Sequence, residues 1–340
     1  MSTTPNSDTP LLEIKDLHVH FPIYGGILRH KVATVKAVDG VSMKIHRGET
    51  VGLVGESGSG KTTVGRAIIN LHKAMSPDVE LSGEVLFDTK DGQIDVNGLA
   101  RREMLPHRSD IQMIFQDPFS SLNPRMTVQQ IIEGPLIIHQ PDMTPEERRD
   151  VVAKLLDRVG LQPKYAARYP HEFSGGQRQR IGIARSLATK PALIVADEPV
   201  SALDVSVQAQ VINLMADLQK EYGLTYLFIA HDLSIVYHIA DKIAVMYLGS
   251  LVEYGTAEQV YKNPKHPYSK ALISAVPKPD PDGKREGRTI LQGDIPSPLA
   301  KPSGCGFRTR CPIAKPECAK DIPELRDMGE GHMAACPFAE

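Results

Sequence analysis

The segment GESGSGKT, residues 55–62, places glycines, a lysine and a threonine at the G-x-x-x-x-G-K-T spacing of a phosphate-binding loop. Its glycines let consecutive backbone N–H groups point into one concavity that can hold phosphate oxygens. From this loop Lys61 can reach the β- and γ-phosphates of a nucleotide, and the Thr62 hydroxyl can ligate Mg²⁺. The pattern predicts nucleotide contacts along one run: Gly55, Glu56, Ser57, Gly58, Ser59, Gly60, Lys61, Thr62 and Thr63.

The flanking sequence supplies the elements that such a loop needs. The apolar run 50–53 is typical of a buried strand, and residues 63–71 carry apolar side chains at helical spacing. A helix that begins behind the loop presents its positive dipole end to the phosphates. A glycine-rich turn without a ligand is the alternative, and the strand–loop–helix order argues against it.

Polar side chains follow three further apolar strands. Gln116 ends one of them, where its amide could bridge Mg²⁺ or an attacking water. Asp197 and Glu198 end the run ALIVADE, and adjacent acids after buried residues are costly unless a cation or ligand uses them. Asp197 would hold Mg²⁺, Glu198 would polarise water, and His231, after strand 225–230, would hydrogen-bond the γ-phosphate. Solvated side chains at strand ends are the alternative.

Two short motifs each precede a helix. FSGGQ, with Ser174, Gly175, Gly176 and Gln177, offers backbone N–H groups and the positive end of a helix dipole to an anion. Asp204, in SALD, stands directly before the helix predicted over 205–222. An ordinary helix N-cap is the alternative for both motifs, and for Asp204 the two roles are compatible.

The composition is that of a globular protein without a bias toward nucleic acid. The chain has 340 residues, 41% of them hydrophobic, and a net charge of −2. No uncharged apolar stretch approaches the ~20 residues that cross a bilayer. The polar N-terminus lacks the basic start and apolar core of a signal peptide. We therefore expect a cytoplasmic protein that reaches a membrane only through partners.

Periodicity predicts an α/β core that is interrupted by helices. Residues 11–20 and 34–46 alternate as half-buried strands with a loop at 24–31 between them, whereas the pattern of 117–190 is helical. The strand–helix–strand order after residue 190 indicates a mainly parallel sheet. We expect a P-loop NTPase (RecA-like) core with an antiparallel β edge region, an inserted α-helical subdomain and an irregular C-terminal extension over 257–340.

All four cysteines lie in the last 36 residues, within a proline-rich segment: Cys305, Cys311, Cys318 and Cys336. In a cytoplasmic protein, metal binding is a better explanation for such clustering than disulfides. Their spacings include no C-x2-C pair of the kind common in zinc sites, and two of them precede proline, as around iron–sulfur clusters. We expect a [4Fe–4S] cluster, with Zn²⁺ and free thiols as alternatives. Three cations could offset its negative charge: Arg308, Arg310 and Lys315.

Taken in chain order, the phosphate loop, FQDP, FSGGQ, ALIVADE and IAHD resemble the nucleotide-binding domain of an ABC transporter over residues 11–256. The resemblance implies a head-to-tail pair of cassettes, in which each FSGGQ signature, together with Asp204, closes over the partner's ATP. It implies a shared set of roles in ATP hydrolysis: Glu198, His231 and Lys61 in catalysis, and Thr62, Gln116 and Asp197 on Mg²⁺. Phe21 and Tyr24 are the nearest candidates for the family's adenine-stacking aromatic.

Three runs narrow the resemblance to the ATP-binding subunits of oligopeptide and dipeptide importers: FQDPFSSLNPRMTV (115–128), HPYSKALISAVP (266–277) and GDIPSPLAKPSGCGFRTRCP (293–312). The implied partners are a related but different cassette subunit, two transmembrane permease subunits and an extracytoplasmic peptide-binding protein. The implied place is the cytoplasmic face of the membrane. Nickel or sugar is the alternative cargo. A soluble cassette ATPase acting on nucleic acid fits less well, because no coiled coil, second cassette or zinc knuckle is evident.

Overall fold

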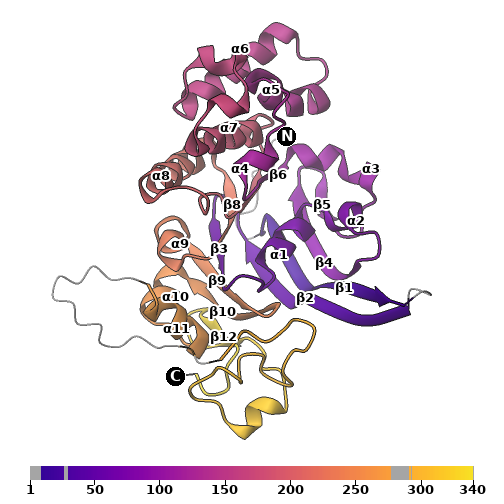
Figure 1. The fold of residues 1–340 in the computed structure, drawn as a ribbon, viewed down its shortest axis with the longest axis vertical. Coiled ribbons are helices and arrows are strands. Elements are labelled where there is room, and N and C mark those ends of the chain that lie inside the picture. Colours follow the sequence, from indigo (N-terminus) through magenta and orange to yellow (C-terminus); the bar gives the residue numbers. More distant parts are fainter. Residues whose placement is uncertain (1–8, 27–29, 277–290, 292, 340) are drawn as a thin grey trace, which may run out of the picture. The chain divides into compact units, whose positions relative to one another are not determined.

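The computed structural model describes residues 9–26, 30–276, 291 and 293–339, and these form two compact units (Figure 1). The first unit contains residues 46–49 and 99–229. The second contains residues 10–45 and 50–98 and the described residues from 230 onward. None of the described helices combines the length and apolarity needed to cross a bilayer.

A parallel sheet lies at the centre of the first unit. Its strands are β6 (Ile111–Ile114), β7 (Leu193–Asp197) and β8 (Thr225–Ala230), in the order β8-β7-β6. All residues of β7 and β8 are buried, as expected for parallel strands covered on both faces. The carboxyl ends of the strands therefore lie at one edge of the sheet, where the predicted polar residues follow them.

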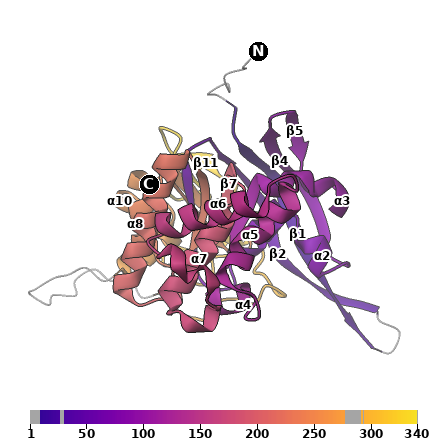
Figure 2. The ribbon, with the colours of Figure 1, turned by 90° about the horizontal axis from the view of Figure 1, so that it is seen from above.

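A layer of helices is inserted between β6 and β7 (Figure 2). It comprises α4 (Pro118–Ser121), α5 (Val128–His139), α6 (Pro145–Arg158) and α7 (Gly175–Leu187), with 3-10 turns at Pro163–Ala167 and Pro170–Glu172. The capping box at Thr144 is present, since its hydroxyl accepts from Glu147 N and its N–H donates to the Glu147 carboxylate. The predicted helical insertion is confirmed. The unit also contains α3 (Arg101–Met104), a 3-10 turn (Pro106–Ser109) and α8 (Val205–Tyr222).

The second unit contains an antiparallel sheet with the strand order β2-β1-β4-β5. Its strands are β1 (Leu12–Gly25), β2 (His30–Ile45), β4 (Glu80–Thr89) and β5 (Gly92–Asp95). β1 and β2 are longer than the alternation predicts, and the predicted loop at 24–31 is shorter, because Tyr24 pairs with Lys31 and Gly25 with His30. This sheet confirms the predicted antiparallel region.

The phosphate loop follows β3, which within the second unit is the last of five paired strands in the order β11-β12-β10-β9-β3. β3 (Thr50–Val54) is parallel to β9 (Lys242–Tyr247), and β10 (Ser250–Thr256) is antiparallel to β9. The C-terminal strands β12 (Met333–Ala334) and β11 (Arg326–Asp327) extend this edge. The helices of the unit are α1 (Lys61–Ile68), α2 (His72–Met75), α9 (Leu233–Ile239), α10 (Ala257–Lys262), α11 (Pro267–Ser274) and a 3-10 turn (Pro316–Ala319).

A buried carboxylate joins the C-terminal extension to this sheet. Glu253, on β10, is fully buried and accepts hydrogen bonds from the backbone N–H groups of Lys265 and His266, each at 2.8 Å. His332 Nε2 lies 2.7 Å from the same carboxylate. Figure 1 shows the yellow C-terminal segment lying along β10 and β12. The extension, although largely irregular as predicted, is thus built into the second unit.

His266 makes the stability of this region sensitive to acid. Its Nδ1 caps α11 by accepting from Tyr268 N at 3.1 Å, and burial lowers the pKa of His266 to about 4, although Glu253 opposes the shift. In the unfolded chain the same imidazole has a pKa near 6.5. The contribution of His266 to the free energy of unfolding is therefore fully present above that pH and is lost as the pH falls toward 4. Between pH 7 and pH 5 we expect a loss of about 2 kcal/mol from this residue.

Urea unfolding of the whole chain at the two pH values measures this loss. The control is His266→Asn, because asparagine keeps an N-cap acceptor but does not titrate. The variant should be less stable at pH 7 and lose about 2 kcal/mol less than wild type on acidification. An equal acid-induced loss in both proteins would contradict the assignment.

Candidate nucleotide-binding site and cysteine cluster

The phosphate loop connects β3 to α1 within the second unit. Gly60 is the N-cap of α1 with φ +103°, and Gly58 has φ +78°, so both adopt backbone conformations that favour glycine. Lys61 is buried, and its Nζ donates to the carbonyl oxygens of Gly55 at 2.8 Å and Glu56 at 3.0 Å. The loop therefore surrounds the ammonium group of Lys61, whose positive charge suits the binding of a phosphate.

Ser59 provides a separate sign that the loop suits a polar ligand. Its hydroxyl is buried and has no hydrogen-bond partner among the residues that the structure describes. Such a group costs about 1–3 kcal/mol, which a hydrogen bond to a ligand would recover. Thr62 and Thr63 follow at the start of α1 and are half-buried, and their contacts with Mg²⁺ and phosphate stay predictions.

In the first unit, the structure brings Gln116 and Glu198 together. Gln116 Nε2 donates to Glu198 Oε2 at 2.8 Å. Glu198 has φ +44°, a conformation that costs a side-chain-bearing residue about 1–3 kcal/mol and is typical of functional positions. Its N–H donates to the Ile229 carbonyl at 2.9 Å, which holds the turn in place. Asp197, one residue earlier, is 3% exposed at the end of β7.

The signature segment and Asp204 both cap helices, as the alternative prediction states. Ser174 Oγ accepts from Gln177 N at 3.3 Å, and Ser174 N donates to Gln177 Oε1 at 3.1 Å, so α7 begins with a capping box. Asp204 Oδ1 accepts from Val207 N at 3.0 Å at the start of α8. The two capping residues, Ser174 and Asp204, are exposed, whereas Gly176 is buried. Gly175 and Gly176 form the first turn of α7.

The remaining predicted nucleotide contacts lie in the second unit. His231 follows β8 and is exposed. Phe21, on β1, lies edge to face against His72 with ring centroids 5.5 Å apart, and Tyr24 is 42% exposed near the end of the same strand. The adenine-stacking role of Phe21 stays a prediction.

The four cysteines gather in the second unit. Burial raises the pKa of Cys305, and the nearby thiols of Cys318 and Cys336 raise it further. Burial also raises the pKa of Cys311, which interacts with the same three thiols. The backbone N–H groups two residues further along lower the pKa of three of these thiols against the larger effect of burial: Phe307 at Cys305, Ile313 at Cys311 and Phe338 at Cys336. Donors of this kind stabilise thiolates that ligate a metal.

A glycine fixes the backbone between two of the cysteine-bearing segments. Gly304, with φ +63°, lets Cys305 N donate to the Cys318 carbonyl at 2.8 Å, where an added Cβ would lie 2.4 Å from that oxygen.

The cations predicted to offset the cluster's charge have other contacts. Arg310 forms an ion pair with Glu56 of the phosphate loop, at 2.7 Å. Arg308 Nε donates to the Ser303 carbonyl at 2.8 Å, and Lys315 Nζ lies 4.0 Å from the centroid of the Phe338 ring. At Cys336, Arg326 and Lys270 are the cations that lower the pKa against the effect of burial.

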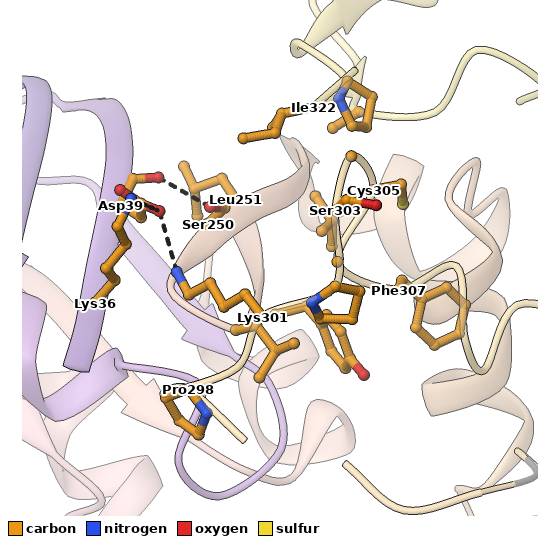
Figure 3. A pocket seen from close by; sticks show the side chains of 18 of the residues that line it. Lys36, Asp39, Ser250, Leu251, Pro298, Lys301, Ser303, Cys305, Phe307 and Ile322 are labelled. Atoms are coloured by element: carbon orange, nitrogen blue, oxygen red, sulfur yellow. Dashed lines mark hydrogen bonds and ion pairs between the residues drawn. The ribbon is translucent and has the colours of Figure 1, made fainter. Parts of the chain in front are cut away.

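A polar cluster that sequence patterns did not predict lies on the antiparallel sheet. Asp39 Oδ1 is 3.1 Å from His18 Nδ1 and 3.2 Å from His20 Nε2. Lys301 Nζ donates to Asp39 Oδ2 at 3.2 Å, as Figure 3 shows. Burial alone would raise the pKa of Asp39, but Lys301 and His18 together lower it. Because Lys301 already balances the carboxylate, a bound cation is not needed here. Strand alternation places the two histidines on one face, but it does not give the register of Asp39.

A P-loop on an α/β core, with a helical insertion and an antiparallel sheet, is the architecture of an ABC-type ATPase. The family model described as "ABC transporter" matches residues 38–201, and "Oligopeptide/dipeptide transporter, C-terminal region" matches residues 252–318. The chain belongs to the family of ATP-binding subunits of oligopeptide ABC transporters.

Individual relatives agree with this placement. The chain is 53% identical to the oligopeptide transport ATP-binding protein AppF of Bacillus subtilis (strain 168), over 98% of each chain. It is 55% identical to OppF of Escherichia coli (strain K12), over 93% of this chain and 92% of that protein. Among solved structures, the dimeric post-hydrolysis state of the ATP-binding cassette MJ0796 with ADP and Pi is similar, with a TM-score of 0.61 and 29% identity over 72% of this chain and 98% of that one.

Proposed function

We propose that this chain hydrolyses ATP to power the import of oligopeptides through an ABC transporter. The strongest support is that its similarity to oligopeptide transport ATP-binding proteins continues through the C-terminal region specific to them. The motifs with recognisable chemistry serve phosphate, Mg²⁺ and a metal centre, and none of these motifs is built for a peptide. Peptide selection therefore belongs to the partner subunits.

The sequence motifs assign a set of residues to one ATP. Lys61 and the loop N–H groups bind the phosphates, and Thr62, Gln116 and Asp197 would hold Mg²⁺, which would offset the negative charge of the phosphates. Glu198 orients and polarises the attacking water, and His231 stabilises charge on the γ-phosphoryl group. The contact between Gln116 and Glu198 supports this assignment, since it joins a Mg²⁺ ligand to the water-positioning acid.

A second cassette completes each site. Ser174 to Gln177 and Asp204 would contact the ATP of a partner cassette, and the exposure of the two N-cap residues, Ser174 and Asp204, supports this. The dimer of the similar cassette MJ0796 shows that this fold pairs. The partner is a related but different subunit, and the pair lies peripherally on the cytoplasmic face of the membrane, against two permease subunits. A peptide-binding protein on the other side supplies the cargo.

Transport by the reconstituted complex tests this function. The chain is purified with its permease and cassette partners and placed in vesicles with the peptide-binding protein. Labelled oligopeptide should accumulate only with ATP, whereas nickel and sugar should not. Uptake of nickel or sugar in place of peptide, or isolation with nucleic acid instead of permease subunits, would reject the proposal.

We further propose that Cys305, Cys311, Cys318 and Cys336 hold a [4Fe–4S] cluster with a structural role. Neighbouring thiols raise the pKa of Cys305, Cys311 and Cys336, so these sulfurs lie near one another, and backbone N–H groups beside them favour the thiolate form that a cluster requires. Protein purified without oxygen should be coloured and contain about four iron atoms and four sulfides per chain. Cys318→Ser should lose most of the iron. A colourless protein with one zinc per chain would overturn the proposal.

A further inference from the structure

Two separate segments of the C-terminal extension converge on one residue of the phosphate loop, Glu56. Tyr268, at the start of α11, accepts a hydrogen bond from Glu56 N through its hydroxyl at 2.8 Å. Arg310 contacts the Glu56 side chain with both terminal nitrogens: Nη1 to Oε2 at 2.7 Å and Nη2 to Oε1 at 3.0 Å. A bidentate pair of this kind fixes direction as well as distance.

The side chain of Arg310 is buried next to a group of packed aromatic rings. Its side chain is 7% exposed, and Nη1 also donates to the Tyr247 hydroxyl at 3.4 Å. Tyr247, Tyr268 and Phe307 pack against one another with ring centroids 4.7–5.3 Å apart. Because Phe307 and Arg310 belong to the same cysteine-bearing turn, this aromatic cluster holds the guanidinium in place.

The backbone carbonyl of Glu56 makes hydrogen bonds with later residues of the same loop. Its carbonyl oxygen accepts from Ser59 N at 3.2 Å and from Lys61 Nζ at 3.0 Å. Its N–H and its carboxylate are held by the extension. A displacement of Glu56 would therefore move the two groups that the loop presents to phosphate, the ammonium of Lys61 and the turn at Ser59.

Charge gives Arg310 a second effect. Glu56 places a carboxylate within a loop that binds an anion, and like charges so near weaken binding. Arg310 neutralises this carboxylate at short range. The turn that carries Arg310 is itself fixed, because Cys305 N donates to the Cys318 carbonyl, and Lys301 ties the preceding chain to Asp39 (Figure 3).

We propose that Arg310 is a positioning residue for nucleotide binding. It holds Glu56, and through it the phosphate loop, in the conformation that binds ATP, and it neutralises the negative charge of the Glu56 carboxylate. The cysteine-bearing turn thereby sets the nucleotide affinity of a loop more than 240 residues earlier in the chain. This inference rests on the proposed phosphate-binding role of the loop.

The test is the dissociation constant of a fluorescent ATP analogue for the full-length chain. Arg310→Ala should weaken binding by about tenfold or more, since an unpaired carboxylate and a loosened loop both oppose the phosphates. The matched control is Arg308→Ala, in the same turn, whose guanidinium contacts Ser303. That control should bind within twofold of wild type. Equal affinities in Arg310→Ala and wild type would overturn the inference.

A double-mutant cycle separates positioning from general loss of structure. Glu56→Gln removes the charge that Arg310 balances, so adding Arg310→Ala to it should weaken binding much less than Arg310→Ala does alone. Arg310→Lys keeps the positive charge but cannot form the bidentate contact with Glu56. This variant should remain folded and bind the analogue with an intermediate affinity. Additive effects, or wild-type affinity in Arg310→Lys and Arg310→Ala alike, would reject the role.

Lys61→Ala distinguishes this inference from the proposed function. If wild type binds the analogue and Lys61→Ala does not, the loop is the nucleotide site, and the Arg310 variants judge the inference alone. If wild type binds no nucleotide, the proposed function itself fails, and the inference with it. Cys311→Ser should weaken nucleotide binding in the wild-type protein but should cause no further weakening in the Arg310→Ala variant. If it weakened binding equally in both proteins, the cysteine-bearing turn would not act through Arg310.

Discussion

Replacing Glu198 by glutamine should lower the ATP turnover of the assembled transporter by at least about 100-fold, while ATP still binds. Glutamine keeps the volume of the side chain and can still accept the hydrogen bond from Gln116 Nε2. It cannot polarise the attacking water as a carboxylate does, and contributions of this type are worth about 10²–10⁴ in rate. Steady-state phosphate release and equilibrium binding of an ATP analogue measure the two properties separately.

Glu221→Gln is the control for this substitution. Glu221 is another carboxylate of the first unit, partly exposed and paired with Arg158, and its loss should leave turnover unchanged. A Glu198→Gln transporter with normal turnover would remove Glu198 from the reaction. Loss of ATP binding in the same variant would instead indicate that Glu198 holds the nucleotide rather than the water.

Gly60→Ala should destabilise the protein by about 3–5 kcal/mol. An added Cβ would lie 2.2 Å from the Ala37 carbonyl oxygen and 2.8 Å from Met246 Cε, and the residue has φ +103°. The first of these contacts is with backbone, which cannot rotate away. Denaturant unfolding of the full chain gives the change in free energy.

Gly58→Ala is the matched substitution in the same loop. Gly58 also has a positive φ, at +78°, but nothing lies within 4 Å of its added Cβ. Only the backbone strain remains, and we expect a cost of about 1–2 kcal/mol. If both variants lost the same stability, the close approach of Gly60 to Ala37 would not be the cause.

Local sequence patterns predicted those structural features that depend on residues close together in the chain. Helix α8 begins at Val205 and ends before Gly223 as predicted, because an aspartate cap and a C-terminal glycine act within one turn. The motif spacing likewise located the phosphate loop and the strand ends that carry Asp197, Glu198 and Gln116. These residues act through the backbone geometry immediately around them.

Contacts between distant segments were not predictable in the same way. Arg310 was expected to balance thiolates near it in sequence, but it pairs with Glu56, because a bidentate carboxylate partner is available there. Asp39 meets His18 and His20 only through the register of β1 and β2, which contains several bulges. Periodicity shows which face a side chain occupies, and long-range packing decides what lies opposite it.

Glu253 has a consequence for any attempt to trim this protein. A fragment that ends at residue 256, where the nucleotide-binding domain ends by sequence, would keep this buried carboxylate but lose all three of its donors, from Lys265, His266 and His332. It would also uncover the edge of β10 that β12 now covers. The extension therefore completes the fold of the cassette: its removal would leave a buried carboxylate unpaired and a strand edge open.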